Sequence, residues 1–262
     1  PSEIESHFSG GAISFSLIKT RCMKTIKFLF GLMATTLLIT ACKKEDVGVY
    51  HYDEVHPQED ILTRAGIDSV LSTFPTIPYL ETLEMYKDST DPERKFNNEL
   101  NSRELYIITG DEIYKKVIGN YRVKHFLAKD SFYKRNLKNP GAKNTQLWLI
   151  DKNVLYMMLE LIHRLDEGGY NMYGFHIRNS HRHPAHNEKV SGAKYSQHMF
   201  GRAIDIGVDD VNQNGTSDLD DKAILYDLLQ DIVGNKGGLG LYPGKMSLHF
   251  DCRGHRARWD WP

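Results

Sequence analysis

Residues 196–206 read SQHMFGRAIDI and contain an imidazole and a carboxylate, those of His198 and Asp205. Side chains on one helix face recur at three- or four-residue spacing, so these two do not share a helix face. Residues 202–208 alternate polar and apolar, which predicts a strand carrying Asp205, preceded by a loop carrying His198 and a turn at Gly201. Both groups are zinc ligands, and a catalytic zinc site needs three ligands and an open position. The spacing also fits a surface histidine and a strand-end aspartate that never meet.

A third ligand candidate lies near the C-terminus. The glycine-rich segment 237–244, GGLGLYPG, precedes a short apolar run at 247–251, SLHFD. Alternate residues of a strand share a face, so we expect His249 and Asp251 to point to the same side.

Three sequence blocks form one ordered pattern: 179–187 (NSHRHPAHN), 196–206, and 237–259 from the glycine-rich segment to Trp259. In order, spacing and residue type the pattern resembles the zinc D-Ala-D-Ala carboxypeptidase family. That family shares its fold with the hedgehog signalling domain and the vancomycin-resistance dipeptidases. The resemblance covers about 145–262. It implies an α+β fold, hedgehog/DD-peptidase-like, with a small antiparallel sheet and flanking helices.

The same resemblance implies a function and a metal. The chain is expected to be a zinc metallopeptidase that cleaves peptidoglycan peptide stems, as a D,D-carboxypeptidase or an endopeptidase. The zinc ligands would be His198, Asp205 and His249. Arg182 matches the family arginine that binds substrate, where a guanidinium can take a carboxylate or carbonyl through two hydrogen bonds. Asn187 and Ser196 match polar positions that line or hold the substrate site.

The proton carrier is harder to assign. Several relatives place an acid three residues before the last zinc-binding histidine, where this chain has Met246. Asp251 is the remaining carboxylate and is predicted to be catalytic; the alternative is that it anchors a ligand histidine. The nearby His181 and His183 are candidates for contact with substrate, and if Asp251 is only an anchor the base is sought among His181, His183 and His186. Met246 also leaves open a catalytically silent, metal-stabilised module that binds wall peptides or a protein partner.

Residues 210–221, DVNQNGTSDLDD, have the spacing of an EF-hand loop. Oxygen side chains fall at positions 1, 3, 5, 9 and 12, with glycine at position 6, and dockerin-type loops also end in Asp. We expect structural Ca²⁺ bound by the loop residues Asp210, Asn212, Asn214, Thr216, Asp218 and Asp221. The alternative is a polar turn that caps the helix expected at 222–233.

The N-terminal part has the pattern of a bacterial lipoprotein signal peptide. A basic start at 23–27 and an apolar run at 28–40 end in the lipobox LITAC, whose last residue is Cys42. This predicts a signal peptide over 23–41, a lipid on Cys42, a tether over 42–59 and a place in the cell envelope at a membrane. A transmembrane anchor and a buried helix with an isolated cysteine are the alternatives. Residues 1–22 are expected to be upstream translation.

The remaining sequence places weaker limits on function. The chain has 262 residues, a net charge of −1 and a pI near 7.0, which provide no general attraction to nucleic acid. Apolar spacing predicts a helix at 152–168. Segment 60–144 shows helical patterns at 61–71 and 80–86 and strand patterns after them, without recognisable chemistry. It is either a subdomain or an elaboration of the peptidase domain at 145–262. Cys252 is expected to be a small buried residue rather than a nucleophile.

Overall fold

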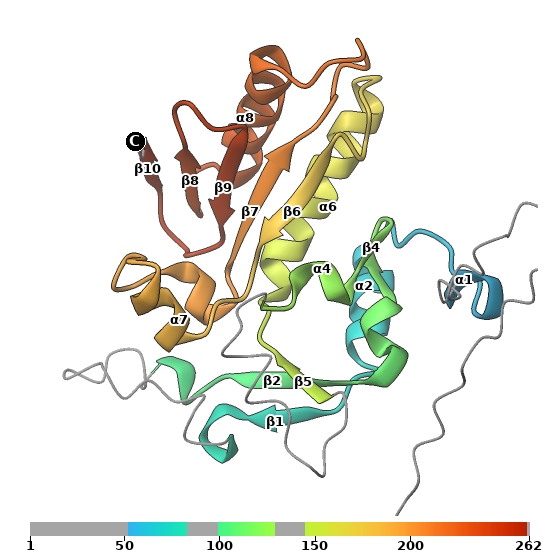
Figure 1. Cartoon of the computed structure of the whole chain (residues 1–262), viewed down its shortest axis with the longest axis vertical. Helices are drawn as coiled ribbons and strands as arrows, with labels where there is room; N and C mark the ends of the chain where they lie inside the picture. The colour runs from blue at the N-terminus through green and yellow to red at the C-terminus, as the bar shows by residue number, and fades with distance from the viewer. Residues whose placement is uncertain (1–51, 83–98, 129–144, 261–262) are drawn as a thin grey trace, which may run out of the picture. The chain divides into compact units, whose positions relative to one another are not determined.

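The computed structural model describes residues 52–82, 99–128 and 145–260, shown as the coloured ribbon of Figure 1. The predicted signal peptide, Cys42 and most of the predicted tether lie outside the described residues. The last part of that tether forms the short helix α1 (Tyr52–Val55). No helix within the described ranges is long and apolar enough to cross a membrane.

The larger sheet has five strands in the order β10-β8-β9-β7-β6. All neighbouring pairs are antiparallel except β10 and β8, which run parallel at one edge. In chain order the strands are β6 (Phe175–Asn179), β7 (Ala203–Val208), β8 (Gly238–Leu241), β9 (Ser247–Asp251) and β10 (Ala257–Asp260). The sheet is therefore mixed at its β10 edge, whereas the sequence predicted an antiparallel one.

Two amphipathic helices pack against this sheet, α6 (Lys152–Glu167) and α8 (Leu219–Val233). The side chain of Asp151 caps α6 by accepting from the Asn153 N–H, and Asp218 caps α8 in the same way. Their apolar residues share one core with the alternate strand residues Ile204, Ile206, Leu248 and Phe250.

Strand alternation explains how this sheet supports a polar site. Since Ile204 and Ile206 face the helices, Asp205 between them faces the other side. In the β7–β9 register Asp205 is paired directly with His249. The sheet therefore carries an apolar face toward the helices and two potential metal ligands on its opposite face.

A second, three-stranded antiparallel sheet has the order β1-β2-β5, with strands β1 (Thr76–Pro78), β2 (Glu104–Thr109) and β5 (Thr145–Trp148). Near it lie α2 (Arg64–Leu71), α4 (Val123–Phe126), the 3-10 helices η1 (Tyr79–Glu81) and η3 (Gly110–Tyr114), and the hairpin of β3 (Lys116–Ile118) and β4 (Tyr121–Arg122). Short helix α7 (Pro184–Lys189) and 3-10 helix η4 (Gln197–Phe200) precede β7.

The described part of segment 60–144 shares its core with the predicted peptidase domain. Ile67 and Phe126 belong to the same buried cluster as Val154 and Phe250. The Tyr121 hydroxyl also donates to the carbonyl of Phe175, at 2.6 Å. These contacts favour an elaboration of the peptidase domain over an independent subdomain.

The predicted α+β class is confirmed, and so are the helices expected at 61–71, 152–168 and 222–233. The helix expected at 80–86 is described only up to residue 82, where the chain forms 3-10 helix η1.

Candidate metal centre

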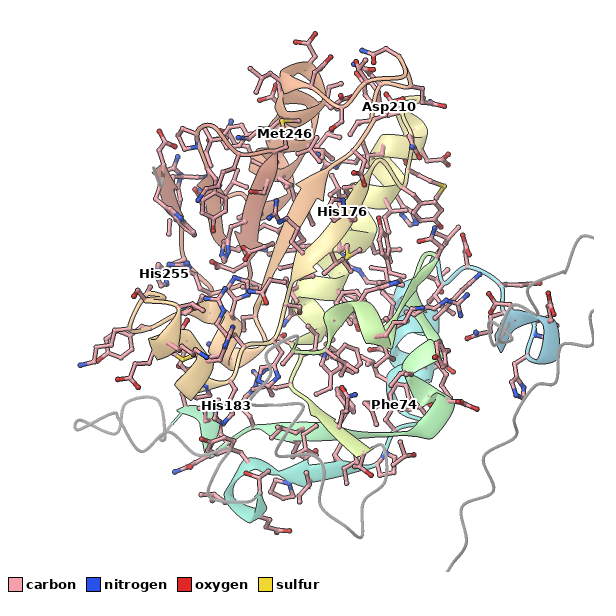
Figure 2. All side chains as sticks on the ribbon, in the orientation of Figure 1. Phe74, His176, His183, Asp210, Met246 and His255 are labelled. Atoms are coloured by element: carbon pink, nitrogen blue, oxygen red, sulfur yellow. The ribbon has the colours of Figure 1, made fainter. Side chains whose placement is uncertain are left out.

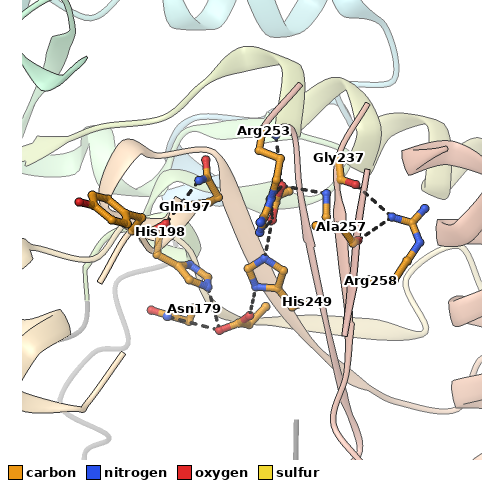
Figure 3. Close-up of polar contacts among 12 residues, drawn as sticks. Asn179, Gln197, His198, Gly237, His249, Arg253, Ala257 and Arg258 are labelled. Atoms are coloured by element: carbon orange, nitrogen blue, oxygen red, sulfur yellow. Dashed lines mark hydrogen bonds and ion pairs between the residues drawn. The ribbon is translucent and has the colours of Figure 1, made fainter. Parts of the chain in front are cut away.

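His198, Asp205 and His249 converge on the exposed side of the larger sheet (Figure 3). One carboxylate oxygen of Asp205 lies 2.8 Å from His249 Nδ1, and the other lies 3.2 Å from His198 Nε2. The potential ligand atoms all lie within 4.8 Å of one another. The structure thus brings together the three residues that the sequence proposed as zinc ligands.

His198 is held in a single ring orientation by the backbone around it. Its Nδ1–H donates to the carbonyl of Ser180 at 2.7 Å, which leaves the Nε2 lone pair directed toward Asp205. The 3-10 helix η4 that carries His198 ends at Gly201, whose φ is +67°. A Cβ at Gly201 would also lie 2.5 Å from the Leu149 carbonyl oxygen, so both conformation and space require glycine here.

His249 is held from its other side by Asp251. Its Nε2 lies 3.0 Å from Asp251 Oδ2, so Nε2–H is the donor and Nδ1 faces Asp205. Trp259 of β10 packs on the ring, with centroids 5.0 Å apart, and Gly240 leaves room for the indole. Carboxylates in this position fix the tautomer of metal-binding histidines and raise their basicity.

Asp251 occupies the position of an anchor. Its side chain is fully buried and accepts hydrogen bonds from the backbone N–H of Gly238 and from the guanidinium of Arg253. Burial opposes its ionisation, but Arg253 and His249 hold the pKa of Asp251 well below its usual value. This geometry favours the anchoring alternative, because a carboxylate already bonded to several donors is a poor proton acceptor.

The electrostatics of the centre suit a cation. Burial opposes ionisation of Asp205, yet His198 and His249 keep its pKa well below the ordinary range. Burial likewise opposes a charge on His249, but hydrogen bonds to Asp205 and Asp251 raise its pKa to about 9. In the metal-free site a protonated His249 lies between Asp205 and Asp251, and Arg253 supplies a second positive charge beside Asp251.

The donor set fits Zn²⁺. Two imidazole nitrogens and one carboxylate oxygen are ligands that zinc prefers, and three protein ligands are typical of catalytic zinc sites. Each imidazole has its second nitrogen bonded to a carbonyl or a carboxylate, as in metal sites.

The rings of His198 and His249 line a cleft of about 590 Å³. Arg182 and Ser196, which the sequence proposed as substrate-binding residues, line it too. Arg182 Nη2 lies 3.9 Å from Asp205 Oδ2, and Nη1 donates to Asn187 Oδ1 at 3.0 Å. Asn187 is buried beside the cleft and orients Arg182.

The nearby histidines lie away from this cleft. His181 and His183 are buried around a small apolar pocket formed with Leu149 and Met199, and Figure 2 shows His183 in the lower part of the molecule. Burial lowers the pKa of His181 to about 3. His176 is instead exposed and pairs with Asp209, at 2.9 Å. His186, half-buried on α7, does not line the cleft either, so the suggestion that His181, His183 or His186 acts there finds no support among the described lining residues.

Met246 packs against the core, and no Asp or Glu is among the described residues that line the cleft.

Tyr242 also lines the cleft and was not among the candidate residues identified from the sequence. Burial raises the pKa of Tyr242, and nearby Asp205 raises it further, so the phenol remains a hydrogen-bond donor. Its position in the block 237–244 was the available signal. Cys252 was expected to be buried but is half-buried, and burial raises the pKa of its thiol to about 12, which disfavours a nucleophile.

The 210–221 loop has its polar side chains turned onto its own backbone. Asp210 accepts from the N–H groups of Asn214 and Gly215, and Asn214 accepts from that of Thr216. Buried Asp221 accepts from Val211, Asn212 and Asp218 backbone N–H groups. Asp218 is the N-cap of α8, which agrees with the capping alternative.

Residues 153–223 match the family model described as Peptidase M15. This segment is therefore similar to part of an M15 zinc peptidase. The matched segment includes Arg182, His198 and Asp205, whereas His249 lies beyond it and reaches the centre through the β7–β9 pairing. No curated protein and no solved structure gave a match.

Proposed function

We propose that this chain is a zinc metallopeptidase that cleaves the peptide stems of peptidoglycan, as a D,D-carboxypeptidase or an endopeptidase. The observation that carries the proposal is the convergence of His198, Asp205 and His249 at a cleft also lined by Arg182. The M15 match supports the peptidase class. The three-block resemblance supports the cell-wall substrate.

Each residue of the site has a defined task in such a reaction. His198, Asp205 and His249 would hold Zn²⁺, which when bound polarises a peptide carbonyl and lowers the pKa of water. Arg182 binds a carboxylate or carbonyl of the substrate through its guanidinium. Asn187 orients Arg182, and Asp251 keeps the Nδ1 atom of His249 available.

The proposal is tested by incubating the zinc-loaded full chain with purified peptidoglycan fragments and weighing the products by mass spectrometry. Loss of a terminal D-alanine or cleavage of a cross-bridge is expected. A chelated sample provides the control and should release no product. Intact fragments after prolonged incubation with the zinc-loaded chain would contradict the proposed peptidase function.

A second candidate is a catalytically silent, metal-stabilised module that binds wall peptides or a protein partner. The absence of a carboxylate at the position of Met246, together with the saturated hydrogen bonding of Asp251, favours it. It predicts binding of stem peptides without products. Calorimetry on the same fragments separates the two functions.

We propose further that the 210–221 loop binds Ca²⁺ and stabilises the start of α8. Support comes from the ligand spacing and from the six candidate ligand residues within one short loop. The role is structural, because the loop contributes no residue to the lining of the zinc cleft.

The pattern at 23–42 supports one more proposal: a mature chain lipidated on Cys42 and held at a bacterial membrane. Several acyl chains would anchor it firmly, whereas one alone binds marginally. Cys42→Ala should release the chain to the soluble fraction or leave an unprocessed precursor. A processed variant that stays membrane-bound would contradict the anchor.

A further inference from the structure

The cleft beside the metal centre has an unbalanced charge. Among the described residues that line it are three cations, Arg182, Lys245 and Arg253, and no Asp or Glu. The whole chain is nearly neutral, with 33 basic and 34 acidic residues. The positive lining is therefore a local feature, and a cleft lined by one sign of charge attracts ligands of the opposite sign.

Two of these cations have protein partners. Arg253 donates to Asp251 through Nε and Nη2, and its guanidinium lies over the Trp259 ring. Arg182 is bonded to Asn187 and lies near Asp205. Both have roles in building the site.

Lys245 differs from them. It is exposed, and its Nζ lies 5.9 Å from the centre of the Tyr242 ring. No carboxylate of the described residues forms an ion pair with it. Lys245 therefore presents an ammonium group to the cleft whose anionic partner is not supplied by this part of the chain.

The backbone of Lys245 is fixed by a tight turn. Tyr242, Pro243, Gly244 and Lys245 form it, with the Lys245 N–H donating to the Tyr242 carbonyl at 3.1 Å. Proline at the second position and glycine at the third, with φ +71°, are typical of a type II turn. The position from which the ammonium extends is thus set by backbone geometry.

A buried lysine attaches this turn to helix α8. Lys222 is 6% exposed, and its Nζ donates to the carbonyls of both Tyr242 and Lys245, each at 2.7 Å. Two charge-assisted bonds from one buried ammonium hold the turn at the cleft. Such support reduces the conformational entropy that substrate binding must otherwise overcome.

We propose that Lys245, beside Tyr242, forms a subsite for a carboxylate within the substrate and makes the cleft selective for acidic peptides. This carboxylate is additional to the group taken by Arg182. The inference rests on the proposed peptidase function and specifies the substrate class of the same cleft. Tyr242, whose ring centre lies 5.9 Å from the ammonium, lines the same cleft and carries a neutral hydroxyl donor.

The test compares stem peptides of identical sequence in which an internal carboxylate is either free or amidated. The C-terminal carboxylate is kept free in both, so that recognition by Arg182 is unchanged. The zinc-loaded full chain should cleave the acidic peptide with a kcat/KM about tenfold higher, the size expected of one hydrogen bond to a charged group. Lys245→Gln should remove this preference, and kcat/KM for the acidic peptide should then depend less on salt concentration.

Lys194→Gln is the matched control. Lys194 also lies over a tyrosine ring, that of Tyr195 at 5.5 Å, but it is not among the residues lining the cleft. It should keep the full preference. Equal cleavage of both peptides by the unmodified chain, or an unchanged preference in Lys245→Gln, would overturn the subsite.

Failure of the peptidase function gives a different result. A chain that cleaves neither peptide would overturn the enzyme, and the subsite would then be tested by calorimetric binding of the same two peptides. A tenfold tighter Kd for the acidic peptide, lost in Lys245→Gln, supports the subsite. Equal Kd values would overturn it.

Discussion

The zinc centre and the 210–221 loop are both rich in metal-ligand side chains, yet they are built in opposite ways. The loop is one continuous segment, and its carboxylates accept hydrogen bonds from its own backbone N–H groups. The zinc centre joins η4, β7 and β9, and its ligand atoms face one another instead of the backbone. The loop therefore keeps its backbone conformation without a cation. In the zinc centre, by contrast, a cation would bind ligand atoms that otherwise face one another.

The largest effect is expected from loss of a zinc ligand. His198→Ala should abolish stoichiometric zinc and, with it, hydrolysis of stem peptides. Metal analysis of the purified variant measures the first and product mass the second. His176→Ala, which removes an exposed histidine outside the centre, should keep one zinc per chain. Retention of one zinc by His198→Ala would contradict the assignment.

Calcium should act on stability and leave the zinc centre unchanged. A ligand that binds only the native state stabilises it by about 2.7 kcal/mol at a hundredfold excess over Kd. The Tm should rise with added calcium, and Asp210→Ala should erase that rise while zinc stays bound. Asp209→Ala, a neighbour outside the loop, should keep the rise. A Tm that does not change up to millimolar calcium would leave the loop as a helix-capping turn.

Asp251→Asn separates anchoring from proton transfer. An anchor lost from a ligand histidine weakens metal binding by about 10–100-fold. A lost general base instead slows turnover by about 10²–10⁴-fold without changing metal affinity. The buried, saturated geometry predicts weaker zinc and recovery of the rate once zinc is saturating, with exposed Asp231→Asn as the control. A slow variant with normal zinc affinity would make Asp251 the base.

The last prediction concerns the pH dependence of zinc affinity. The pKa of His249 is raised to about 9 in the metal-free protein, because the pull of Asp205 and Asp251 exceeds the opposing effect of burial. Zinc must displace this proton, so its affinity should fall by about tenfold per unit as pH decreases from about 9 to 7. Competition with a metal-binding dye measures it. Asp251→Asn, which removes one source of the raised pKa, should move the decrease to lower pH. An affinity independent of pH over this range would show that His249 is already neutral.

The two regions also differ in how far they can be predicted. The 210–221 loop could be recognised from spacing, because its candidate ligands and its glycine lie within twelve consecutive positions. The strand carrying Asp205 and helices α6 and α8 follow from local periodicity and capping residues. His198, Asp205, His249 and Arg182 were identified because they fall in matching sequence blocks. Spacing alone left open whether they meet.

What depended on the folded chain is the arrangement of groups distant in sequence. The β7–β9 register, set by burial of Ile204, Ile206, Leu248 and Phe250, places Asp205 opposite His249. Asp251 bonds Nε2 of His249, the ring nitrogen that faces away from Asp205, which indicates an anchor instead of a general base. The HxD pattern in the sequence does not distinguish these two roles. The attachment of Lys222 to the 242–245 turn likewise joins a helix to a loop with no local signal. Helices, strands, turns and caps are determined by residues close in sequence. These contacts instead form because packing of the apolar face brings polar groups distant in sequence to one place.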